Sequence, residues 1–272
     1  MSKQSNNLES QTIWITGASS GIGEAIALAA AKRGAHLILS ARNEEKLIAV
    51  KNSCEQLHNN VSCHIITLDL SIPEELPVAV LRAKSLVNKV DVLVNNGGVS
   101  QRGFARDTPL NIDRRIMEIN FFGNIALSKA ILPWMTEKKG GRIVVISSIS
   151  GKFGFFMRSA YAASKHALQG FYESLRLEEK SNNINVNIVY PGIINTPISK
   201  SALNAEGKKH GKLDTKQANG MPVDQCAEVI IDGWIKNKKE ILVGGKELKA
   251  VWIKRLFPSL FFKMIAKQSA TK

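Results

Sequence analysis

The sequence predicts an α/β protein in which a doubly wound parallel sheet of about seven strands carries helices on both faces. Two observations lead to this fold class. Short apolar runs alternate with longer amphipathic or alanine-rich segments along most of the chain, and strands that alternate with helices form parallel sheets. Glycine or polar residues follow most of the apolar runs. Because ligands bind beyond the carboxyl ends of parallel strands, one edge of this sheet should collect the functional residues.

Composition places the chain among globular proteins. It has 272 residues, of which 44% are apolar and 22% are charged, and single α/β domains reach this length. We therefore expect one domain over 1–272, with a core at about 10–245, a substrate loop at 195–220 and a basic amphipathic tail at 246–272. The sequence contains neither an internal repeat nor an interdomain linker.

Charge and cysteine content restrict the function classes. The net charge of +14 suits nucleic acid, a membrane surface or a phosphorylated ligand, but the lysines are scattered, which favours a solvated basic surface. Three widely spaced cysteines indicate reduced thiols, and five histidines without ligand spacing indicate no metal site. Residues 1–10 are polar and no apolar run approaches the ~18 residues of a spanning helix. We expect a cytoplasmic protein.

The first expected strand, Gln11–Thr16, leads into a glycine-rich turn and then an alanine-rich helix over 24–33. Strand, glycine turn and helix in this order form a dinucleotide-binding unit. Glycine lets the backbone approach a pyrophosphate, and the helix N-terminus favours its negative charge. The spacing in Gly17–Gly23 is Gly-x-x-x-Gly-x-Gly and not the commoner Gly-x-Gly-x-x-Gly.

The second expected strand, Ala35–Ser40, bears on cofactor choice. A cofactor with an unmodified ribose usually meets an acidic residue at this position, whereas this chain continues with Ala41 and Arg42. Arg42 could hold a 2′-phosphate. The alternative is a surface arginine that precedes the helix expected at 43–57.

The third and fourth expected strands, Val61–Leu68 and Val90–Asn95, are separated by a helix from Pro73 to about Lys89. Asp69 follows the third strand and could accept a hydrogen bond from adenine or cap a turn. Asn96, Gly97 and Gly98 follow the fourth, and the two glycines would let a cofactor pass close to the backbone.

The remaining elements continue the alternation. We expect helices at Ile112–Lys138, with Asn120 inside it, from Ser159 to about Lys180, and at Val223–Asn237, and strands at Arg142–Ser147, Ile184–Tyr190 and Glu240–Val243.

Tyr161 and Lys165 are four positions apart at the start of the expected helix that begins at Ser159, so both side chains lie on one face. A phenol has a pKa of roughly 10, and a nearby ammonium lowers it. A tyrosine tuned in this way can exchange a proton with a carbonyl or alcohol oxygen. Ser148 ends the preceding strand and could hydrogen-bond that oxygen. Tyr-x-x-x-Lys alone is a weak signal, and Ser148 with the glycine turn makes it specific.

These motifs together resemble the short-chain dehydrogenase/reductase family, which has a Rossmann-type fold. The resemblance covers about residues 10–245. It rests on the motifs Thr16–Gly23, Asp69, Asn95–Gly98, Asn120, Ser148, Tyr161-x-x-x-Lys165 and Pro191–Thr196. The segment from Arg158 to Phe171 is similar to the branch that holds dehydrogenase/reductase member 7-like and 11β-hydroxysteroid dehydrogenase-like enzymes.

The resemblance implies site residues. The catalytic ones would be Asn120, which anchors a water, Ser148, which holds the substrate oxygen, Tyr161 as general acid–base, and Lys165, which also bonds the nicotinamide ribose. The residues implied or expected to bind NADP(H) are Gly17, Ser19, Ser20, Gly21, Ile22, Gly23, Arg42, Asp69, Leu70, Asn96, Gly97, Tyr161, Lys165, Pro191, Gly192, Ile194 and Thr196.

The chain departs from the family pattern at Gly97, where alanine is usual. Only a methyl group is lost, so cofactor binding should survive. The N-terminal membrane helix of some branch members is not expected here, and the tail after about Lys246 matches no family motif.

We predict an NADP(H)-dependent oxidoreductase that transfers a hydride between the nicotinamide and a carbonyl or secondary alcohol. The alternative is a non-catalytic nucleotide-binding regulatory protein, because fold alone does not fix function. Phe153, Phe155, Phe156 and Met157 suggest an apolar substrate, unless they serve ordinary packing. Nucleic-acid binding is not expected, since no recognition module is present.

Two partner surfaces are expected. Leu168, Phe171, Tyr172, Leu175 and Leu177 exceed what one helix face requires, which favours a homodimer or homotetramer unless they pack on their own sheet. Residues 247–267 form two apolar stripes with basic flanks, interrupted at Pro258. This tail should cover the pocket or a neighbouring subunit, with weak peripheral membrane contact as the second possibility.

Overall fold

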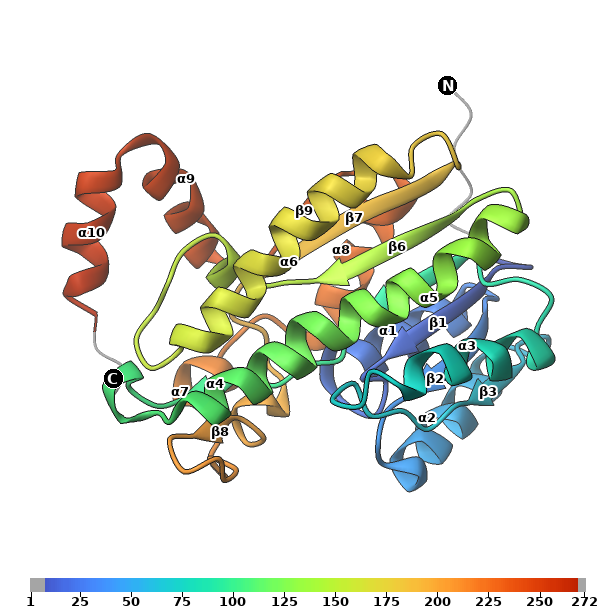
Figure 1. The fold of residues 1–272 in the computed structure, drawn as a ribbon, viewed down its shortest axis with the longest axis horizontal. Helices are drawn as coiled ribbons and strands as arrows, with labels where there is room; N and C mark the ends of the chain where they lie inside the picture. The colour runs from blue at the N-terminus through green and yellow to red at the C-terminus, as the bar shows by residue number, and fades with distance from the viewer. Residues whose placement is uncertain (1–7, 269–272) are drawn as a thin grey trace.

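Seven parallel strands form the central sheet of the computed structural model, which describes residues 8–268 (Figure 1). Residues 1–7 and 269–272, which hold most of the polar N-terminal segment and the end of the tail, lie outside the described part. The strand order is β3–β2–β1–β4–β6–β7–β9. The strands are β1 (Thr12–Thr16), β2 (His36–Ser40), β3 (Cys63–Ile65), β4 (Val92–Asn95), β6 (Gly141–Ile146), β7 (Ile184–Pro191) and β9 (Glu240–Val243). The expected doubly wound parallel sheet is confirmed.

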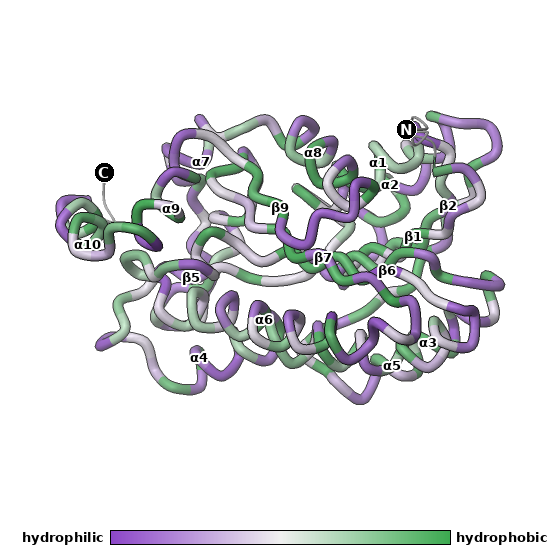
Figure 2. Tube along the Cα trace, turned by 90° about the horizontal axis from the view of Figure 1, so that it is seen from above, coloured by the Kyte–Doolittle hydropathy of each residue, from purple (hydrophilic) through white to green (hydrophobic). Residues whose placement is uncertain are grey.

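Helices cover both faces of this sheet, as the view along its edge shows (Figure 2). One face carries α1 (Gly21–Lys32), α2 (Glu44–Leu57) and α8 (Val223–Ile235), and the other carries α3 (Glu75–Leu86), α5 (Gly123–Glu137) and α6 (Ser159–Glu178). In β1, Ile13 and Ile15 join the first core and Trp14 joins the second. Burial on both faces explains why the strands are apolar runs and not alternating ones.

The long helix expected over Ile112–Lys138 is interrupted at its third turn. α4 (Leu110–Met117) passes into a π-helical turn, η2 (Glu118–Phe122), and then into α5. Asn120 lies in this turn, is fully buried, and bonds to Val99 and Ser164. The extra residue of a π turn aims such a side chain at neighbouring elements, and π turns are frequent at functional sites.

The third strand and the helix after it are shorter than expected. β3 pairs with β2 only over Cys63–Ile65, although Ile66 and Leu68 still donate backbone hydrogen bonds to Leu39 and Ala41. The chain therefore follows the sheet edge to Leu68 without regular strand geometry. The helix expected from Pro73 to about Lys89 begins at Glu75 and ends at Leu86, where Val87 turns extended.

The polar loop expected at 195–220 is structured. Its strand β8 (Leu203–Asn204) pairs in parallel with β5 (Gln101–Arg102), and the short helix α7 (Thr215–Ala218) follows. After β9, the tail forms α9 (Lys249–Leu256) and α10 (Pro258–Ala266), which project from one end of the molecule (Figure 1). Pro258 begins the second tail helix, as the sequence suggested. None of the helices between residues 8 and 268 has the length and apolar content needed to cross a bilayer.

Candidate active site

The turn between β1 and α1 depends on glycine geometry. Gly17 and Gly21 have φ angles of 64° and 61°, and a Cβ at Gly23 would lie 2.4 Å from the Gly17 carbonyl oxygen. Ser20 is the extended N-cap of α1 and makes no side-chain capping bond. The first N–H groups of a helix lack intrahelical partners. The turn, which includes Ser19 and Ile22, can therefore present backbone donors to a pyrophosphate.

The end of β4 is fastened to this turn. The backbone N–H groups of Asn96 and Gly97 donate to Thr16 Oγ1 at 3.0 and 2.9 Å, and Asn96 Nδ2 donates to Thr16 O at 3.0 Å. A Cβ at Gly97 would lie 2.5 Å from Leu70 Cδ1. The leucine therefore occupies the space of the methyl group that the family usually has here.

Arg42 and Asp69 lie at the ends of neighbouring strands. The Arg42 side chain is 60% exposed, and its Nη1 is 3.9 Å from Asp69 Oδ2. Asp69 Oδ1 accepts from Ser71 N and Ser71 Oγ at 2.9 and 2.8 Å, so this carboxylate caps a turn. The exposed guanidinium is free to meet a phosphate on its outer side.

Ser148 and Tyr161 come together beyond the end of β6. Tyr161 is buried in the first turn of α6, and the Ser148 hydroxyl is hydrogen-bonded to its side chain. Lys165 is also buried; its Nζ donates to Ile146 O at 2.8 Å and lies 5.8 Å from the centre of the Tyr161 ring. Two hydroxyls and an ammonium thus converge at one edge of the sheet.

Asn120 completes the set, but its side chain serves the scaffold. Its Oδ1 accepts from Val99 N at 2.7 Å, and its Nδ2 donates to Val99 O and Ser164 Oγ at 2.9 and 3.0 Å. A Cβ at Gly98 would lie 2.9 Å from Asn120 Oδ1 and 3.7 Å from Lys165 Nζ. Asn120 therefore lies close to Lys165, with its amide already bonded on both sides.

Electrostatics at Tyr161 differ from the expectation that Lys165 would lower its pKa. Burial raises the pKa of the Tyr161 hydroxyl, while the hydrogen bond from Ser148 and the guanidiniums of Arg158 and Arg102 lower it. Burial also lowers the pKa of Lys165 to about 8. The cations that favour the phenolate here are arginines that the sequence motifs did not single out.

The segment after β7 closes the other side of the site. Ile194 and Thr196 are buried, and a Cβ at Gly21 would lie 3.3 Å from Thr196 Cβ. The glycine turn and this segment thus face each other across the sheet edge. Thr196 Oγ1 accepts from Gln217 Nε2 at 3.2 Å.

Glu247, at the start of the tail, binds the backbone of the segment that follows β7. Its Oε1 accepts from Ile193 N at 2.8 Å and from Gly245 N at 2.9 Å. A Cβ at Gly192 or Gly244 would lie 2.2 or 2.5 Å from this oxygen. The glycines therefore form a cradle for the carboxylate. Glu247, the only acidic residue after Glu240, was not predicted from the sequence as a site residue.

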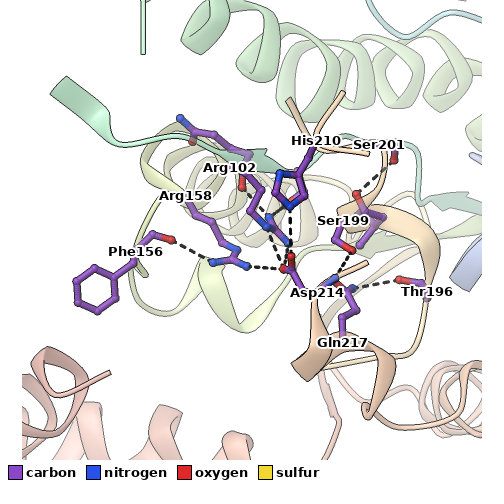
Figure 3. A network of polar contacts seen from close by, with 12 residues as sticks. Arg102, Phe156, Arg158, Thr196, Ser199, Ser201, His210, Asp214 and Gln217 are labelled. Carbon is purple, nitrogen blue, oxygen red and sulfur yellow. Dashed lines mark hydrogen bonds and ion pairs between the residues drawn. The ribbon is translucent and has the colours of Figure 1, made fainter. Parts of the chain in front are cut away.

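A second group of residues that sequence analysis missed is the cluster of Arg102, Arg158, His210 and Asp214 (Figure 3). Asp214 Oδ2 accepts from Arg102 Nε and Nη2 at 3.0 and 2.6 Å and from Arg158 Nη2 at 3.3 Å. His210 Nε2 is 3.7 Å from Asp214 Oδ1. Arg158 lies three positions before Tyr161. This closeness in sequence was the one signal that could have identified the cluster.

Burial now distinguishes the alternatives that the sequence left open for two groups of apolar residues. Leu168, Tyr172 and Leu175 belong to the core of their own subunit, so they supply no pairing surface; Leu177 is 76% exposed. The aromatic segment at 153–157 is divided: Phe153 is buried and packs against Phe261 of the tail, with ring centroids 5.1 Å apart and the rings tilted by 60°, whereas Phe155, Phe156 and Met157 are half-buried.

The tail lies beside the site. Lys254 Nζ donates to Lys152 O at 2.6 Å, and a surface hollow of about 240 Å³ is lined by residues of the tail, of β9 and by Lys152. This hollow is separate from the sheet edge that gathers Tyr161 and the glycine turn.

Comparison with known proteins agrees with this geometry. The sequence pattern of the short chain dehydrogenase family matches residues 11–207. A "Dehydrogenase/reductase SDR family protein 7-like" of Drosophila melanogaster is 40% identical over 267 residues, which are 97% of this chain and 82% of that protein.

Solved structures show the same fold. A short-chain dehydrogenase/reductase from Burkholderia phymatum in complex with NAD has a TM-score of 0.82 at 21% identity, covering 93% of this chain and 96% of that one. An alcohol dehydrogenase from Thermococcus sibiricus complexed with 5-hydroxy-NADP has a TM-score of 0.74 at 24% identity, covering 87% and 97%. With its parallel sheet, its glycine turn and this likeness over nearly its whole length, the chain belongs to the short-chain dehydrogenase/reductase family, in the branch of the member 7-like proteins, and is an oxidoreductase by family.

Proposed function

We propose that this protein is an NADP(H)-dependent oxidoreductase that interconverts a carbonyl and a secondary alcohol, with Tyr161 as general acid–base. The observation that carries the proposal is the placement of the Tyr161 and Ser148 hydroxyls beside buried Lys165 at the carboxyl edge of the sheet. The cofactor supplies or takes the hydride when bound. The glycine turn fits such a group, because it leaves backbone donors uncovered and no Cβ in the way.

The chain's own residues would then transfer the proton and hydrogen-bond the substrate oxygen. In reduction, the Tyr161 hydroxyl donates its proton to the carbonyl oxygen, and Ser148 hydrogen-bonds that oxygen. The phenolate left on Tyr161 is stabilised by Ser148 and by the guanidiniums of Arg158 and Arg102. In oxidation the same steps run in reverse. Lys165 would bond the nicotinamide ribose. Asn120, whose side-chain amide also bonds to Val99 and Ser164, would anchor a water of the proton relay.

Replacing Tyr161 by phenylalanine tests the catalytic assignment. The ring and its packing remain, so NADPH should still bind, while kcat falls by roughly a hundredfold or more because the transferable proton is gone. Tyr172→Phe is the matched control: it removes a buried hydroxyl of the same helix that bonds to Ser128 and Asn95, so it should lower stability and leave kcat near wild type. Wild-type kcat in Tyr161→Phe would refute the role.

Cofactor choice is tested at Arg42. This exposed guanidinium follows β2, where no acidic residue stands at Ser40 or Ala41. We expect NADPH to bind more tightly than NADH, and Arg42→Ala to remove roughly tenfold of that preference. Arg82→Ala, an exposed arginine on α3, should leave it unchanged. Equal affinities in the wild type would refute the preference, and titration by NADPH fluorescence decides it.

The non-catalytic alternative predicts a different outcome for NADPH consumption. A regulatory nucleotide-binding protein would bind NADPH and consume none of it with any aldehyde, ketone, hydroxysteroid or retinoid. The hydrogen-bonded Tyr161–Ser148 pair favours the enzyme, because a binding protein has no need of a proton donor at that position.

We also propose that the subunit pairs with itself and that the tail covers the pocket or a neighbouring subunit, with weak peripheral membrane contact as the second possibility. Apolar side chains remain exposed on α4, in the π-helical turn and on α6, namely Leu110, Phe122 and Leu177. On the tail, Trp252, Leu256, Phe257, Leu260, Phe262 and Met264 are exposed among lysines, a pattern that suits a neighbouring subunit or an anionic bilayer. Light scattering at micromolar concentration and salt-dependent co-sedimentation with anionic vesicles test these two contacts.

A further inference from the structure

Arg102 and Arg158 together form a site that the proposed mechanism does not fully use. We call these two residues the arginine pair (Figure 3). The side chain of Arg102 is 7% exposed and that of Arg158 is 19% exposed, and both share a single oxygen, Oδ2, of Asp214. Arg102 is bonded through all three of its nitrogens, because Nε and Nη2 donate to Asp214 and Nη1 donates to Ser100 Oγ and Gln101 O.

Arg158 is bonded much less completely. Of its five N–H donors, one is given to Phe156 O at 3.0 Å and one to Asp214 Oδ2 at 3.3 Å, and within residues 8–268 the others have no hydrogen-bond partner. Its guanidinium lies 5.4 Å from the centre of the Phe155 ring. A guanidinium with free donors in a planar fork is suited to an oxyanion with two oxygens to offer.

The surroundings of Arg158 carry less negative than positive charge. Two guanidiniums face one carboxylate, and Arg158 is the N-cap residue of α6, a helix of 20 residues without an acidic side chain in its first turn. The positive end of the helix dipole therefore adds to the two cations. Burial and the repulsion of Arg102 lower the pKa of Arg158 to about 10. A bound anion would relieve this excess of positive charge.

The arginine pair lies on the substrate side of the tyrosine. Gln101, next to Arg102, accepts a hydrogen bond from Tyr161 N at 3.2 Å, and Arg158 comes three positions before Tyr161. Both guanidiniums lie within electrostatic reach of the Tyr161 hydroxyl. A molecule whose carbonyl meets Tyr161 can therefore reach Arg158 with a group a few bonds away.

We propose that Arg158, positioned by Arg102 and Asp214, binds an oxyanion of the substrate, either a carboxylate or a phosphate ester. The substrate would then be an amphipathic carbonyl or alcohol compound: an acidic group at Arg158, the reacting carbon at Tyr161, and an apolar remainder beside Phe155 and Phe156. The inference rests on the proposed function and refines the expectation of a purely apolar substrate.

Three matched ligands test this inference: a 4-oxoalkanoic acid, its methyl ester, and the phosphate monoester of a hydroxyketone of the same chain length. Binding of each to the protein–NADPH complex is measured by calorimetry, and kcat and KM are measured by NADPH consumption. Wild type, Arg158→Gln, Arg158→Lys and the control Arg82→Gln are compared, with melting temperatures for each.

We expect the wild type to bind an anionic ligand roughly tenfold to a hundredfold more tightly than the ester. Arg158→Gln should lose that difference, Arg158→Lys should keep part of it, and Arg82→Gln should keep all of it. The anion that gains more affinity identifies the oxyanion. The inference is overturned if acids and ester bind equally to the wild type, or if Arg158→Gln weakens all three alike, which would make Arg158 only an anchor for the loop.

Failure of the proposed function gives a separate result. A protein that binds no NADPH, or binds it without consuming any, contradicts the oxidoreductase assignment. Calorimetry of the three ligands with the free protein or with the NADPH complex then still decides whether Arg158 distinguishes anions from the ester.

Discussion

The glycine turn at residues 16–23 and the segment from Ile193 to Asp214 lie at the same edge of the sheet but are held there by different means. The turn is fixed by its own backbone, with Gly17 and Gly21 at positive φ and Gly23 against the Gly17 carbonyl. The later segment is held by two carboxylates that reach far along the chain: Asp214 bonds to Arg102 at a separation of 112 residues, and Glu247 bonds to Ile193 at a separation of 54.

This difference predicts that the two regions are sensitive to opposite kinds of substitution. The turn has no room for added atoms, so it should fail when a side chain grows. The later segment is held by a few charged acceptors, so it should fail when an acceptor is removed.

The largest expected effect is that of a methyl group in the turn. Gly23→Ala would place Cβ 2.4 Å from the Gly17 carbonyl oxygen, and because backbone must move, it should cost about 1–3 kcal/mol of stability and most of the NADPH affinity. Gly154→Ala is the control, since a Cβ there meets nothing within 4 Å. Melting temperature and NADPH titration are the measurements. An unaffected Gly23→Ala would show that the turn is adaptable and remove the contrast.

A smaller effect is expected from removing the Glu247 carboxylate. Glu247→Ala leaves Ile193 N and Gly245 N without their acceptor, so the segment around Ile194 and Thr196 loosens and NADPH affinity should fall roughly tenfold. Glu247→Gln keeps an acceptor oxygen and should lose less.

The affinity for adenosine 2′,5′-bisphosphate distinguishes a local effect on the segment around Ile194 from a loss of the whole cofactor site. This fragment lacks the nicotinamide, so its affinity should be unchanged in Glu247→Ala. Glu228→Ala removes a carboxylate paired with Arg33 on the protein surface and should leave both ligands unaffected. Equal losses for NADPH and the fragment would contradict a local role for Glu247.

A third expected effect is a pH dependence from Lys165. Its pKa is lowered by burial to about 8 in the folded protein, against roughly 10.4 in an unfolded chain. Between these values the unfolded state binds more protons, so the free energy of unfolding rises with pH. Below pH 8 both states are protonated, and the full cost of burying the charge applies.

Lys165→Met should lack this rise, because methionine does not titrate. The stability difference between wild type and Lys165→Met should therefore move in favour of the wild type from pH 8 to about 10.4, as measured by urea unfolding without cofactor at several pH values. A constant difference over that range would mean that the Lys165 pKa is not lowered.

Much of the framework was determined by the sequence alone. The seven strands, the order of elements and the edge where Gly17–Gly23, Ser148 and Tyr161 meet all followed from hydrophobic pattern and glycine spacing. The physical reason is that these signals are local: period, turn chemistry and helix spacing constrain neighbouring residues, and the parallel sheet then carries strand ends to one edge.

Tertiary structure decided the rest. The early end of β3, the π turn at Asn120 and the burial of Tyr172 depend on neighbours across the sheet. Asp214 meets Arg102, and Glu247 meets Ile193, only because β8 pairs with β5 and β9 with β7. No local sequence pattern identifies Asp214, in its lysine-rich loop, or Glu247, in the tail, as a partner of site residues. Such charge pairing is a property of the folded arrangement, because a carboxylate selects its partner by distance in space and not by spacing along the chain.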